Sequence, residues 1–316
     1  MVEDGMTASP LPVLLDEEAR GYMRASKAEN TIRAYRSDWT AFSTWCDDRG
    51  VPSLPAAPET LAVYLAEAAR TLKPSTLTRR CSSISMAHQM AGHESPTRSF
   101  VVRTTLAGIR RQKGTAPEQK APLLTADLRG MMAALPETMA GTRDRALLLL
   151  GFAGALRRSE LVGLDVDDVD DRSDGLVVTV ARSKTDQEGE GRKIGIPYGS
   201  NPATCPVRAV RAWLDRSQIK EGPLFRPIRH GTVLATRLSP RSVALIVKRV
   251  GGAAGLEPMN YAGHSLRAGL VTSAAAAGVA ERTIMNQTGH RSLPTLRRYI
   301  RDGSLFRENA AAAVGL

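Results

Sequence analysis

The chain has 316 residues, which is enough for two domains of ordinary size, each with its own core. Lysine and arginine total 43 against 32 acidic residues, so the formal net charge is +11. This excess favours nucleic acid over a membrane as the partner, because no basic amphipathic helix with an aromatic and leucine face stands out. A basic but inert surface is the alternative that charge alone leaves open.

The cysteines and the apolar segments indicate the cellular compartment of the protein. Cys46, Cys81 and Cys205 fall in no metal-ligand or disulfide spacing, which favours a reducing cytoplasm. The N-terminus lacks a basic stretch followed by an apolar run, so no signal peptide is expected. The longest strongly apolar run, 146–156, is too short to span a bilayer and predicts a buried helix. We therefore expect a cytoplasmic protein without a membrane partner.

A helical domain is predicted over residues 20–111, after a flexible N-terminus at 1–19. Asn30 can cap its first helix, in which apolar residues recur at three- and four-residue steps. Pro58 and Pro74 suit the starts of two more helices. The four predicted helices are 30–45, 58–68, 75–90 and 97–111. Together they predict a compact helical bundle.

The third of these helices carries Thr76, Arg79 and Arg80 near its start. In a DNA major groove, arginine contacts guanine with two hydrogen bonds, and threonine contacts a phosphate or a thymine methyl. A solvated helix face is the alternative interpretation of the same pattern. Arg241, in a later predicted helix, is added as a DNA contact.

Residues 112–122 predict a linker, since they contain a glycine and two prolines and lack apolar periodicity. The second domain, 123–316, is predicted to be mostly α with a small β-sheet, an α+β domain. Its strands are expected at 175–180 and 192–197, separated by a polar loop. Its helices are expected at 125–135, 142–152, 157–164, 203–217, 239–250, 265–277, 280–287, 294–300 and 303–314.

The acidic run 165–171 invites a metal-binding interpretation. Its spacing does not match a calcium loop, which needs a glycine at the sixth position and a glutamate at the twelfth. We expect an exposed connection between a helix and a strand there. No carboxylate cluster then remains for a pair of magnesium ions, and the sequence has no phosphate-binding loop for ATP. Neither a metal nor another cofactor is predicted.

Six polar residues in the second domain suit attack on a phosphodiester. Two arginines, a lysine and two histidines can neutralise, protonate and orient a phosphate, while a tyrosine offers a nucleophile that ends as a covalent ester. One histidine and one arginine are three positions apart at a helix start, so both face the same point, where the helix dipole also favours an anion. The six are Arg157, Lys184, His264, Arg267, His290 and Tyr299.

Each role follows from the residue type. Arg157 and Arg267 would bind the non-bridging oxygens, because a guanidinium is planar and permanently charged. Lys184, at the start of the predicted hairpin loop, suits the general acid for the departing oxygen. His264 would accept the tyrosine proton, and His290 would donate a hydrogen bond to the phosphate.

Each residue also has a plainer interpretation. Arg157 and Glu160 are three positions apart, so they could form a surface ion pair that contributes little to stability. His264 could be a helix cap, and Tyr299 an ordinary half-buried aromatic residue. The catalytic hypothesis gains weight because all the motifs occur in order in one basic, two-part chain.

The sequence resembles the tyrosine site-specific recombinases of the phage integrase family over residues 20–316. The matching segments are similar, in order, to the family's first-arginine box, its hairpin lysine, its His-x-x-Arg box, and its last box with the nucleophile. These segments are Ala155-Leu-Arg-Arg-Ser-Glu-Leu161, Ser183-Lys-Thr185, His264-Ser-Leu-Arg267, and Gly289-His290 with Tyr299. The resemblance implies that the six residues above are catalytic and that Glu160 supports the active-site arginine.

The resemblance also implies an architecture and a partner. A SAM-like helical domain that binds the core DNA site and a catalytic domain would clamp double-stranded DNA, in a compact layout without an additional arm-binding domain. Four protomers, monomeric or weakly associated off DNA, would synapse two specific sites. They would exchange strands through a 3′-phosphotyrosine and a Holliday junction, without metal or ATP.

The tail at 303–314 predicts a short amphipathic helix that cannot persist alone in water. It must dock, either on its own domain or, as the resemblance favours, on a neighbouring protomer in a closed ring. Two rival functions stay open. One is a type IB topoisomerase or telomere resolvase, which uses similar chemistry. The other is a non-enzymatic DNA-binding regulator, because residues 271–300 are similar to a helix-turn-helix.

Overall fold

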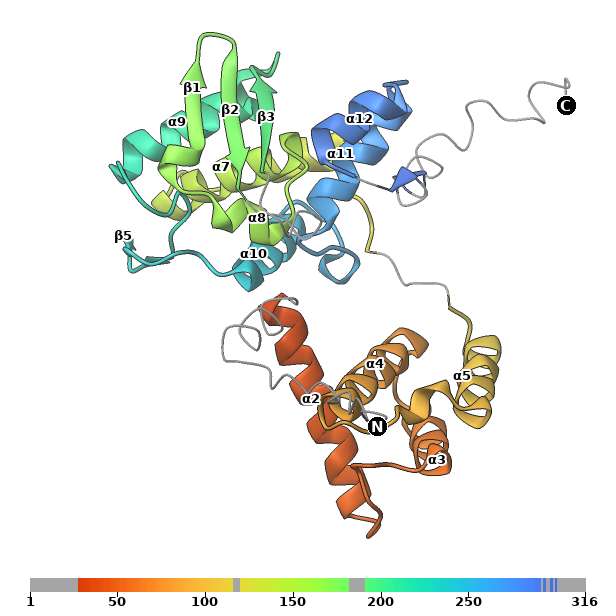
Figure 1. Ribbon diagram of the computed structural model, residues 1–316. Helices are drawn as coiled ribbons and strands as arrows, with labels where there is room; N and C mark the ends of the chain where they lie inside the picture. The colour runs from red at the N-terminus through yellow and green to blue at the C-terminus, as the bar shows by residue number, and fades with distance from the viewer. Residues whose placement is uncertain are drawn as a thin grey trace, which may run out of the picture. The chain divides into compact units, whose positions relative to one another are not determined.

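The computed structural model describes residues 28–115, 120–181 and 191–290, and then residues 292, 293, 296, 297 and 299. The chain divides into two compact units, Met1–Glu118 and Gln119–Leu316 (Figure 1). The predicted flexible N-terminus, Lys184 and the predicted tail helix lie outside the described residues. No helix in the described ranges combines the length and the apolar composition that crossing a bilayer requires.

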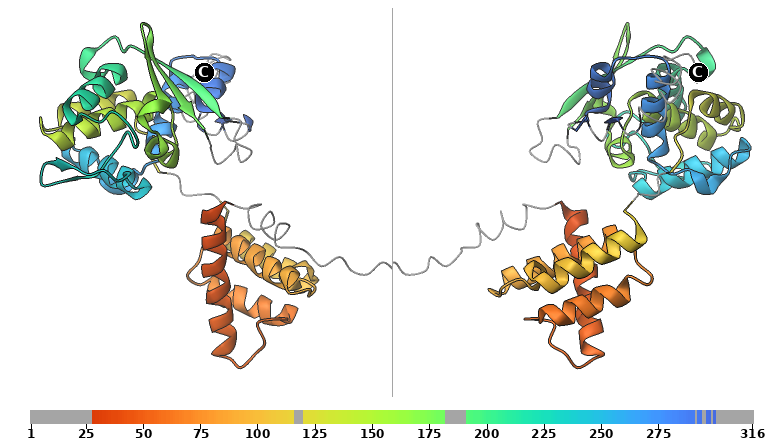
Figure 2. Two further views of the ribbon diagram at one scale, coloured as in Figure 1. Left: turned by 60° about the vertical axis from the view of Figure 1, so that its left-hand side comes forward. Right: turned by 90° about the vertical axis from the view of Figure 1, so that its right-hand side faces the viewer.

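The N-terminal unit is a bundle of helices, seen from two further sides in Figure 2. Helix α2 packs against α4, and α3 packs against α5. The core between them is made of side chains that are fully buried, among them Phe42, Leu61, Leu65, Leu77 and Ile84. The helices are α2 (Glu29–Asp47), α3 (Pro58–Ala68), α4 (Pro74–Met90) and α5 (Phe100–Lys113), with a 3-10 turn η1 (Pro96–Arg98) before α5.

The predicted helices of this unit are confirmed, with two corrections. Asn30 does not cap α2, because the helix already begins at Glu29, and the Asn30 side chain instead accepts a hydrogen bond from Arg33 at 3.3 Å. The fourth helix does not start at residue 97, because Ser99 interrupts the chain and caps α5 by accepting from the Val102 amide at 3.4 Å. Helix α5 also continues to Lys113, inside the range predicted as linker.

The C-terminal unit surrounds a small antiparallel sheet with helices (Figure 1). Helix α7 is its buried centre and packs against α9 and α11, while β3 rests on α9 and α10 packs against α8. The helices are α6 (Thr125–Ala133), α7 (Met139–Ala153), α8 (Arg158–Gly163), α9 (Pro206–Ser217), α10 (Pro240–Ala253), α11 (Ser265–Ala276) and α12 (Glu281–Thr288), with 3-10 turns η2 (Val166–Asp168), η3 (Pro202–Thr204) and η4 (Pro258–Asn260).

The sheet has the order β1-β2-β3. Strands β2 (Gly175–Val180) and β3 (Arg192–Pro197) have the predicted bounds, and Leu176 pairs with Ile196. Both of these side chains face the core, as the alternation of a strand with one buried face requires. The sequence analysis missed the short hairpin of β4 (Ile228–Arg229) and β5 (Thr232–Val233).

The acidic run is not only a connection, as predicted, since it also forms the edge strand β1 (Val169–Arg172). Three of its carboxylates are neutralised by arginines rather than gathered around one point. The pairs are Asp165 with Arg237 at 2.6 Å, Asp170 with Arg172 at 2.7 Å, and Asp171 with Arg211 at 2.6 Å. The edge of the sheet is thus covered by charged side chains, which disfavours pairing with another chain.

One predicted helix start shifts, from residue 142 to Met139, and one predicted start, at Thr125, is confirmed. Thr138, and not Thr142, caps α7, because its hydroxyl accepts a hydrogen bond from the Gly141 amide at 3.1 Å. Thr142 lies inside the helix, where its hydroxyl donates to the Thr138 carbonyl at 3.1 Å. Helix α6 begins at Thr125 itself, after Leu124, so Thr125 is its first residue rather than its cap.

Candidate active site

The turn after α7 contains a strained residue, Ala155, whose carbonyl contacts an arginine of the candidate site. Ala155 has a positive φ of 46°, a left-handed conformation that costs a residue with a β-carbon about 1–2 kcal/mol. The Leu156 amide closes the turn by donating to the Gly151 carbonyl at 3.1 Å. The Ala155 carbonyl accepts a hydrogen bond from Arg267 Nη1 at 2.7 Å. The first-arginine segment and the His-x-x-Arg segment therefore meet at this carbonyl.

Glu160 fixes Arg157 at the start of α8. The Glu160 carboxylate accepts from Arg157 Nη1 at 2.5 Å and from the Arg157 amide at 3.0 Å. Burial alone would raise the pKa of this carboxyl, but hydrogen bonds from Arg157 and the charges of Arg157 and Arg192 hold that pKa below its usual range. With Glu160 only 5% exposed, the alternative of a loose surface ion pair is wrong.

Arg267 enters from the first turn of α11 and is 1% exposed. Its Nη1 is paired, but its buried Nη2 has no hydrogen-bond partner in the described part of the chain. Burial, together with the charges of Arg157 and Arg192, lowers the pKa of Arg267 to about 10, so it still carries its proton at neutral pH. A buried charged donor without a partner is costly, and an anion would satisfy it.

The predicted nucleophile and base are in contact. His264 Nε2 lies 2.8 Å from the hydroxyl of Tyr299, and their ring centroids are 6.0 Å apart. His264 occupies the N-cap position of α11, as the plainer interpretation expected, but its side chain makes no capping hydrogen bond. The Tyr299 ring also lies near His290, with centroids 6.4 Å apart. Tyr299 packs on a small apolar cluster of α11, α12 and the following segment, built on Val271, Ala275, Ile284 and Leu296.

His290 follows Gly289, which ends α12 in the left-handed conformation with φ 65°. Its Nδ1 lies 2.7 Å from the hydroxyl oxygen of Thr288. Burial and the positive charges of Arg267 and Arg157 lower the pKa of His290 to about 3, so the ring is neutral at neutral pH. A neutral imidazole donates from one nitrogen only, so the direction of the Thr288 hydrogen bond sets which nitrogen carries the proton.

Two residues that the sequence analysis did not single out complete the site. Arg192, the first residue of β3, lies 3.3 Å from the second oxygen of Glu160 and donates to the Gln287 carbonyl at 3.0 Å. The Gln287 side-chain amide donates to the carbonyls of Ala153 at 2.8 Å and Gly195 at 3.4 Å. Neither residue belongs to a recognisable motif, and the partners of Arg192 are distant in sequence.

The structure thus gathers Arg157 from the start of α8, His264 and Arg267 from the start of α11, and His290 and Tyr299 from the segment after α12. Lys184 lies outside the described residues, on the segment that joins β2 to β3. The predicted DNA contact Arg241 is exposed in the first turn of α10.

The predicted DNA contacts of α4 are engaged within the N-terminal unit. Arg79 forms a two-pronged ion pair with the buried Asp38, at 2.7 and 3.0 Å, while half of its side chain stays exposed. Arg80 is largely buried between Asp38 and the hydroxyl of Tyr64, to which it donates. Thr76 is partly exposed. A groove-facing role for Arg80 would therefore require it to leave these partners.

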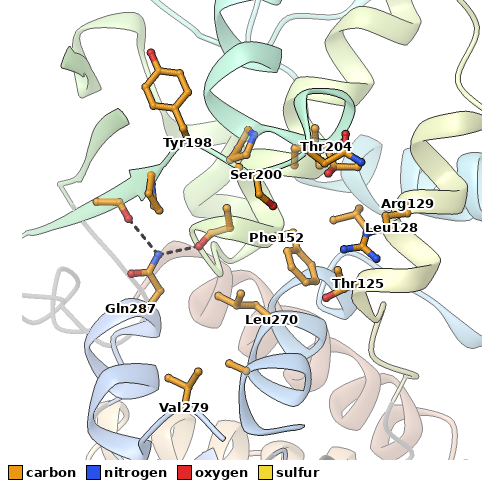
Figure 3. A pocket seen from close by; sticks show the side chains of 18 of the residues that line it. Thr125, Leu128, Arg129, Phe152, Tyr198, Ser200, Thr204, Leu270, Val279 and Gln287 are labelled. Carbon is orange, nitrogen blue, oxygen red and sulfur yellow. Dashed lines mark hydrogen bonds between the residues drawn. The ribbon is translucent and has the colours of Figure 1, made fainter. Parts of the chain in front are cut away.

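An apolar pocket of about 480 Å³ is lined in part by Gln287, which contacts Arg192 of the site (Figure 3). Its walls come from α6, the end of α7, the loop after β3, and the helices α11 and α12. Among the side chains lining it are Phe152, Tyr198, Leu270, Val279 and Gln287. The two dashed hydrogen bonds in Figure 3 are those by which Gln287 ties α12 to Ala153 and Gly195.

Comparison with known proteins assigns the family. The model of the phage integrase family matches residues 123–304, and that of the phage integrase N-terminal SAM-like domain matches residues 21–95. The chain belongs to the phage integrase family. It is therefore a tyrosine recombinase, an enzyme that cleaves and rejoins DNA strands.

Individual relatives agree with this assignment. An integrase/recombinase XerD homologue of Selenomonas ruminantium is 45% identical over 302 residues, covering 94% of this chain and 88% of that protein. The recombinase Cre of Escherichia phage P1 is 25% identical, covering 95% and 94%. A lambda integrase tetramer bound to a Holliday junction shares the fold, with a TM-score of 0.60 at 19% identity, covering 93% of this chain and 78% of that one.

Membership of the phage integrase family also accounts for the helix-turn-helix pattern seen in the sequence. In the structure, α11 and α12 are joined by a turn at Gly278, and their apolar faces carry Leu296 and Tyr299. These helices hold the segment with the predicted nucleophile. The family favours the recombinase over the regulator that this pattern suggested.

Proposed function

We propose that this recombinase cuts a specific DNA site by attack of the Tyr299 hydroxyl on a phosphodiester. The attack forms a tyrosine–phosphorus bond and releases a 5′-hydroxyl, leaving a 3′-phosphotyrosine. The observation that carries the proposal is the 2.8 Å contact between the Tyr299 hydroxyl and His264 Nε2, beside arginines that carry more positive charge than Glu160 can balance. His264 accepts the phenolic proton as the oxygen attacks.

The guanidinium groups of Arg157 and Arg267 stabilise the charge that gathers on the phosphate oxygens. Arg267 Nη2 is buried and charged, and it lacks a partner, so it is a ready donor to an oxygen that becomes more negative in the transition state. His290 stays neutral and donates a hydrogen bond from Nε2, provided that Thr288 donates to Nδ1. Lys184 protonates the departing 5′ oxygen. These cations supply the stabilisation, so the mechanism requires no metal.

Rejoining requires no ATP, because the phosphotyrosine ester keeps the free energy of the broken phosphodiester. The 5′-hydroxyl of the partner strand attacks the phosphorus and gives its proton to Lys184. The bond to the tyrosine oxygen breaks, and that oxygen takes its proton back from His264. Residues 20–111 form the core-binding domain and residues 123–316 the catalytic domain, joined by a linker at 112–122. Buried free cysteines at positions 46, 81 and 205 suit a reducing cytoplasm, where the enzyme would associate with the nucleoid.

A trapped covalent adduct tests the nucleophile. A nicked suicide substrate loses its 5′-hydroxyl fragment, so the wild-type protein accumulates a DNA adduct that survives denaturing gels, with or without EDTA. Tyr299→Phe should form no adduct while binding the site with unchanged affinity, because phosphate contacts supply most of the affinity. An adduct in the Tyr299→Phe protein would reject Tyr299, and inhibition by EDTA that magnesium reverses would reject the metal-free mechanism.

The active assembly is a homotetramer on two synapsed sites that passes through a Holliday junction. The apolar pocket of Figure 3 supports this proposal, because it offers a receptor for a short helix from a neighbouring protomer. The predicted tail helix at 303–314 is the occupant we propose. Its leucine, phenylalanine and alanine side chains match a pocket that is lined mostly by apolar surface.

Truncation after Gly303 tests this assembly. The shortened protein should fold, bind a single half-site and lose cooperative binding to the full site, synapsis and recombination. Leu270→Glu, which changes the pocket and leaves the tail intact, should reproduce the defect. Mixing the two proteins should restore partial cooperativity, since each supplies the part that the other lacks. Recombination at the full rate by either protein alone would contradict docking in trans.

A further inference from the structure

Arg192 is held between two protein acceptors next to the catalytic side chains. One guanidinium nitrogen lies 3.3 Å from Glu160 Oε2, and the other donates to the Gln287 carbonyl at 3.0 Å. The side chain is 20% exposed, and burial lowers its pKa, a shift that the Glu160 charge partly offsets. Both terminal nitrogens are therefore engaged by the protein itself. This geometry suits a residue that places other groups better than one that binds phosphate directly.

The turn that leads to His290 rests on the same guanidinium. Gly289 adopts the left-handed conformation, and a β-carbon there would lie 2.9 Å from Arg192 Nη1. The positive φ favours glycine at this position, and any β-carbon there would displace the Arg192 side chain. The Gly289 amide donates to the Met285 carbonyl at 2.7 Å, which is the last bond of α12.

Arg192 consequently joins three segments that are far apart in sequence. It begins β3, it contacts the carboxylate that fixes Arg157, and it supports the turn that presents His290. Gln287 reinforces the link, because its side chain ties α12 to the carbonyl of Ala153 before the first-arginine turn. We propose that Arg192 is a positioning residue. It holds Glu160 and the turn before His290 in fixed positions relative to each other, so that Arg157 and His290 can bind the same phosphate.

This inference rests on the proposed function for its catalytic readout. Arg192→Gln removes the charge and one arm of the link, whereas Arg192→Lys keeps the charge but not the planar fork that spans two acceptors. Arg211→Gln is the matched control, since Arg211 also pairs with a carboxylate, that of Asp171 at 2.7 and 2.6 Å, and contacts neither Glu160 nor Gln287. Each variant is assayed by single-turnover cleavage of a saturated suicide substrate and by half-site affinity.

We expect Arg192→Gln to slow cleavage about 100-fold, because a displacement on the order of 1 Å of a catalytic group has that effect, while half-site affinity stays within about twofold. Arg192→Lys should recover only part of the rate, and Arg211→Gln should match the wild type. In a double-mutant cycle with Glu160→Gln, the two losses should be strongly non-additive, since both act through one carboxylate. Wild-type cleavage by Arg192→Gln or Arg192→Lys, or additive losses, would overturn the proposal.

A second measurement does not depend on catalysis. Hydrogen exchange at the Gly289 amide should be about tenfold faster in Arg192→Gln than in the wild type, and unchanged in Arg211→Gln, because local opening of the turn becomes easier. Unchanged exchange would also overturn the proposal. If the wild-type protein formed no adduct at all, the proposed function would fail, and the Gly289 exchange would still decide whether Arg192 holds the turn.

Discussion

Asp38 in the N-terminal unit and Glu160 in the C-terminal unit are both buried carboxylates, 3% and 5% exposed, and each lies between two arginines. Around Asp38, Arg79 pairs with the carboxylate, and Arg80 Nε, which is buried without a hydrogen bond, still lies 3.7 Å from that carboxylate. Around Glu160, a third arginine is added, Arg267, and its buried Nη2 has no partner in the described part of the chain. A count of arginine–carboxylate pairs would not separate the two clusters, but the surplus of fixed positive charge does.

The pKa shifts of the two clusters point in opposite directions. The hydrogen bonds that Arg79 donates to Asp38 raise the pKa of Arg79, so that arginine is stabilised in its charged form. Burial and mutual repulsion lower the pKa of Arg192, and lower that of Arg267 to about 10. The catalytic unit thus holds cations that repel one another, and a bound phosphate would relieve that repulsion. We infer that the same residue type stabilises the fold in one unit and forms the proposed anion site in the other.

The largest effect that would sharpen this comparison is the loss of Arg267. We expect Arg267→Ala to slow cleavage of a saturated substrate by at least about 100- to 1,000-fold, because removal of one preorganised donor costs that much. Arg80→Ala, which removes a largely buried arginine from the other cluster, should leave the rate of the saturated complex unchanged. Single-turnover adduct formation measures both, and equal losses would erase the distinction between the clusters.

A smaller effect is expected when each central carboxylate is neutralised. Glu160→Gln should slow cleavage about 10- to 100-fold, because Arg157 loses the group that orients it. Asp38→Asn should leave the rate of the saturated complex intact and lower the unfolding free energy of the N-terminal unit by about 1–3 kcal/mol, as expected when buried partners are left unsatisfied. Hydrogen exchange of α2 and α4 peptides measures the second change. A slower cleavage rate in Asp38→Asn would contradict a purely structural role.

Much of the fold was predictable because its signals are local. The strands at 175–180 and 192–197 and the helices that begin at Pro58 and Pro74 have the expected bounds or differ by one residue. Strand β1 was missed because its pattern is polar, and it is held in the sheet by backbone pairing with β2. No local pattern reports a strand whose side chains are mostly exposed.

The residues of the candidate site were predictable only where reactive residue types occur in a recognisable order and spacing. The order of Arg157, His264, Arg267, His290 and Tyr299 is visible in the sequence, and the structure gathers them. The roles of Arg192 and Gln287 depend on backbone carbonyls of distant segments, and a carbonyl is the same at every position. Likewise, no sequence pattern around Arg79 and Arg80 predicts their ion pairs with Asp38, because Asp38 lies on another helix.

The smallest effect concerns the stability of the DNA-free protein as a function of pH. Burial and nearby cations lower the pKa of His290 to about 3, whereas an unfolded chain restores its ordinary value of 6.5. Below pH 6.5 the unfolded state therefore binds a proton that the folded state does not, so stability is lost as the pH falls towards about 3. His290→Gln removes this loss, since a glutamine does not titrate.

We expect the urea midpoint of the C-terminal unit to fall less steeply in His290→Gln than in the wild type between about pH 7 and about pH 4, where the unfolded histidine gains its proton. His230→Gln, on the exposed turn between β4 and β5, is the matched control and should follow the wild-type slope. Parallel slopes for His290→Gln and the wild type would mean that neither burial nor the cations around Glu160 lower the pKa of the His290 ring in the folded protein.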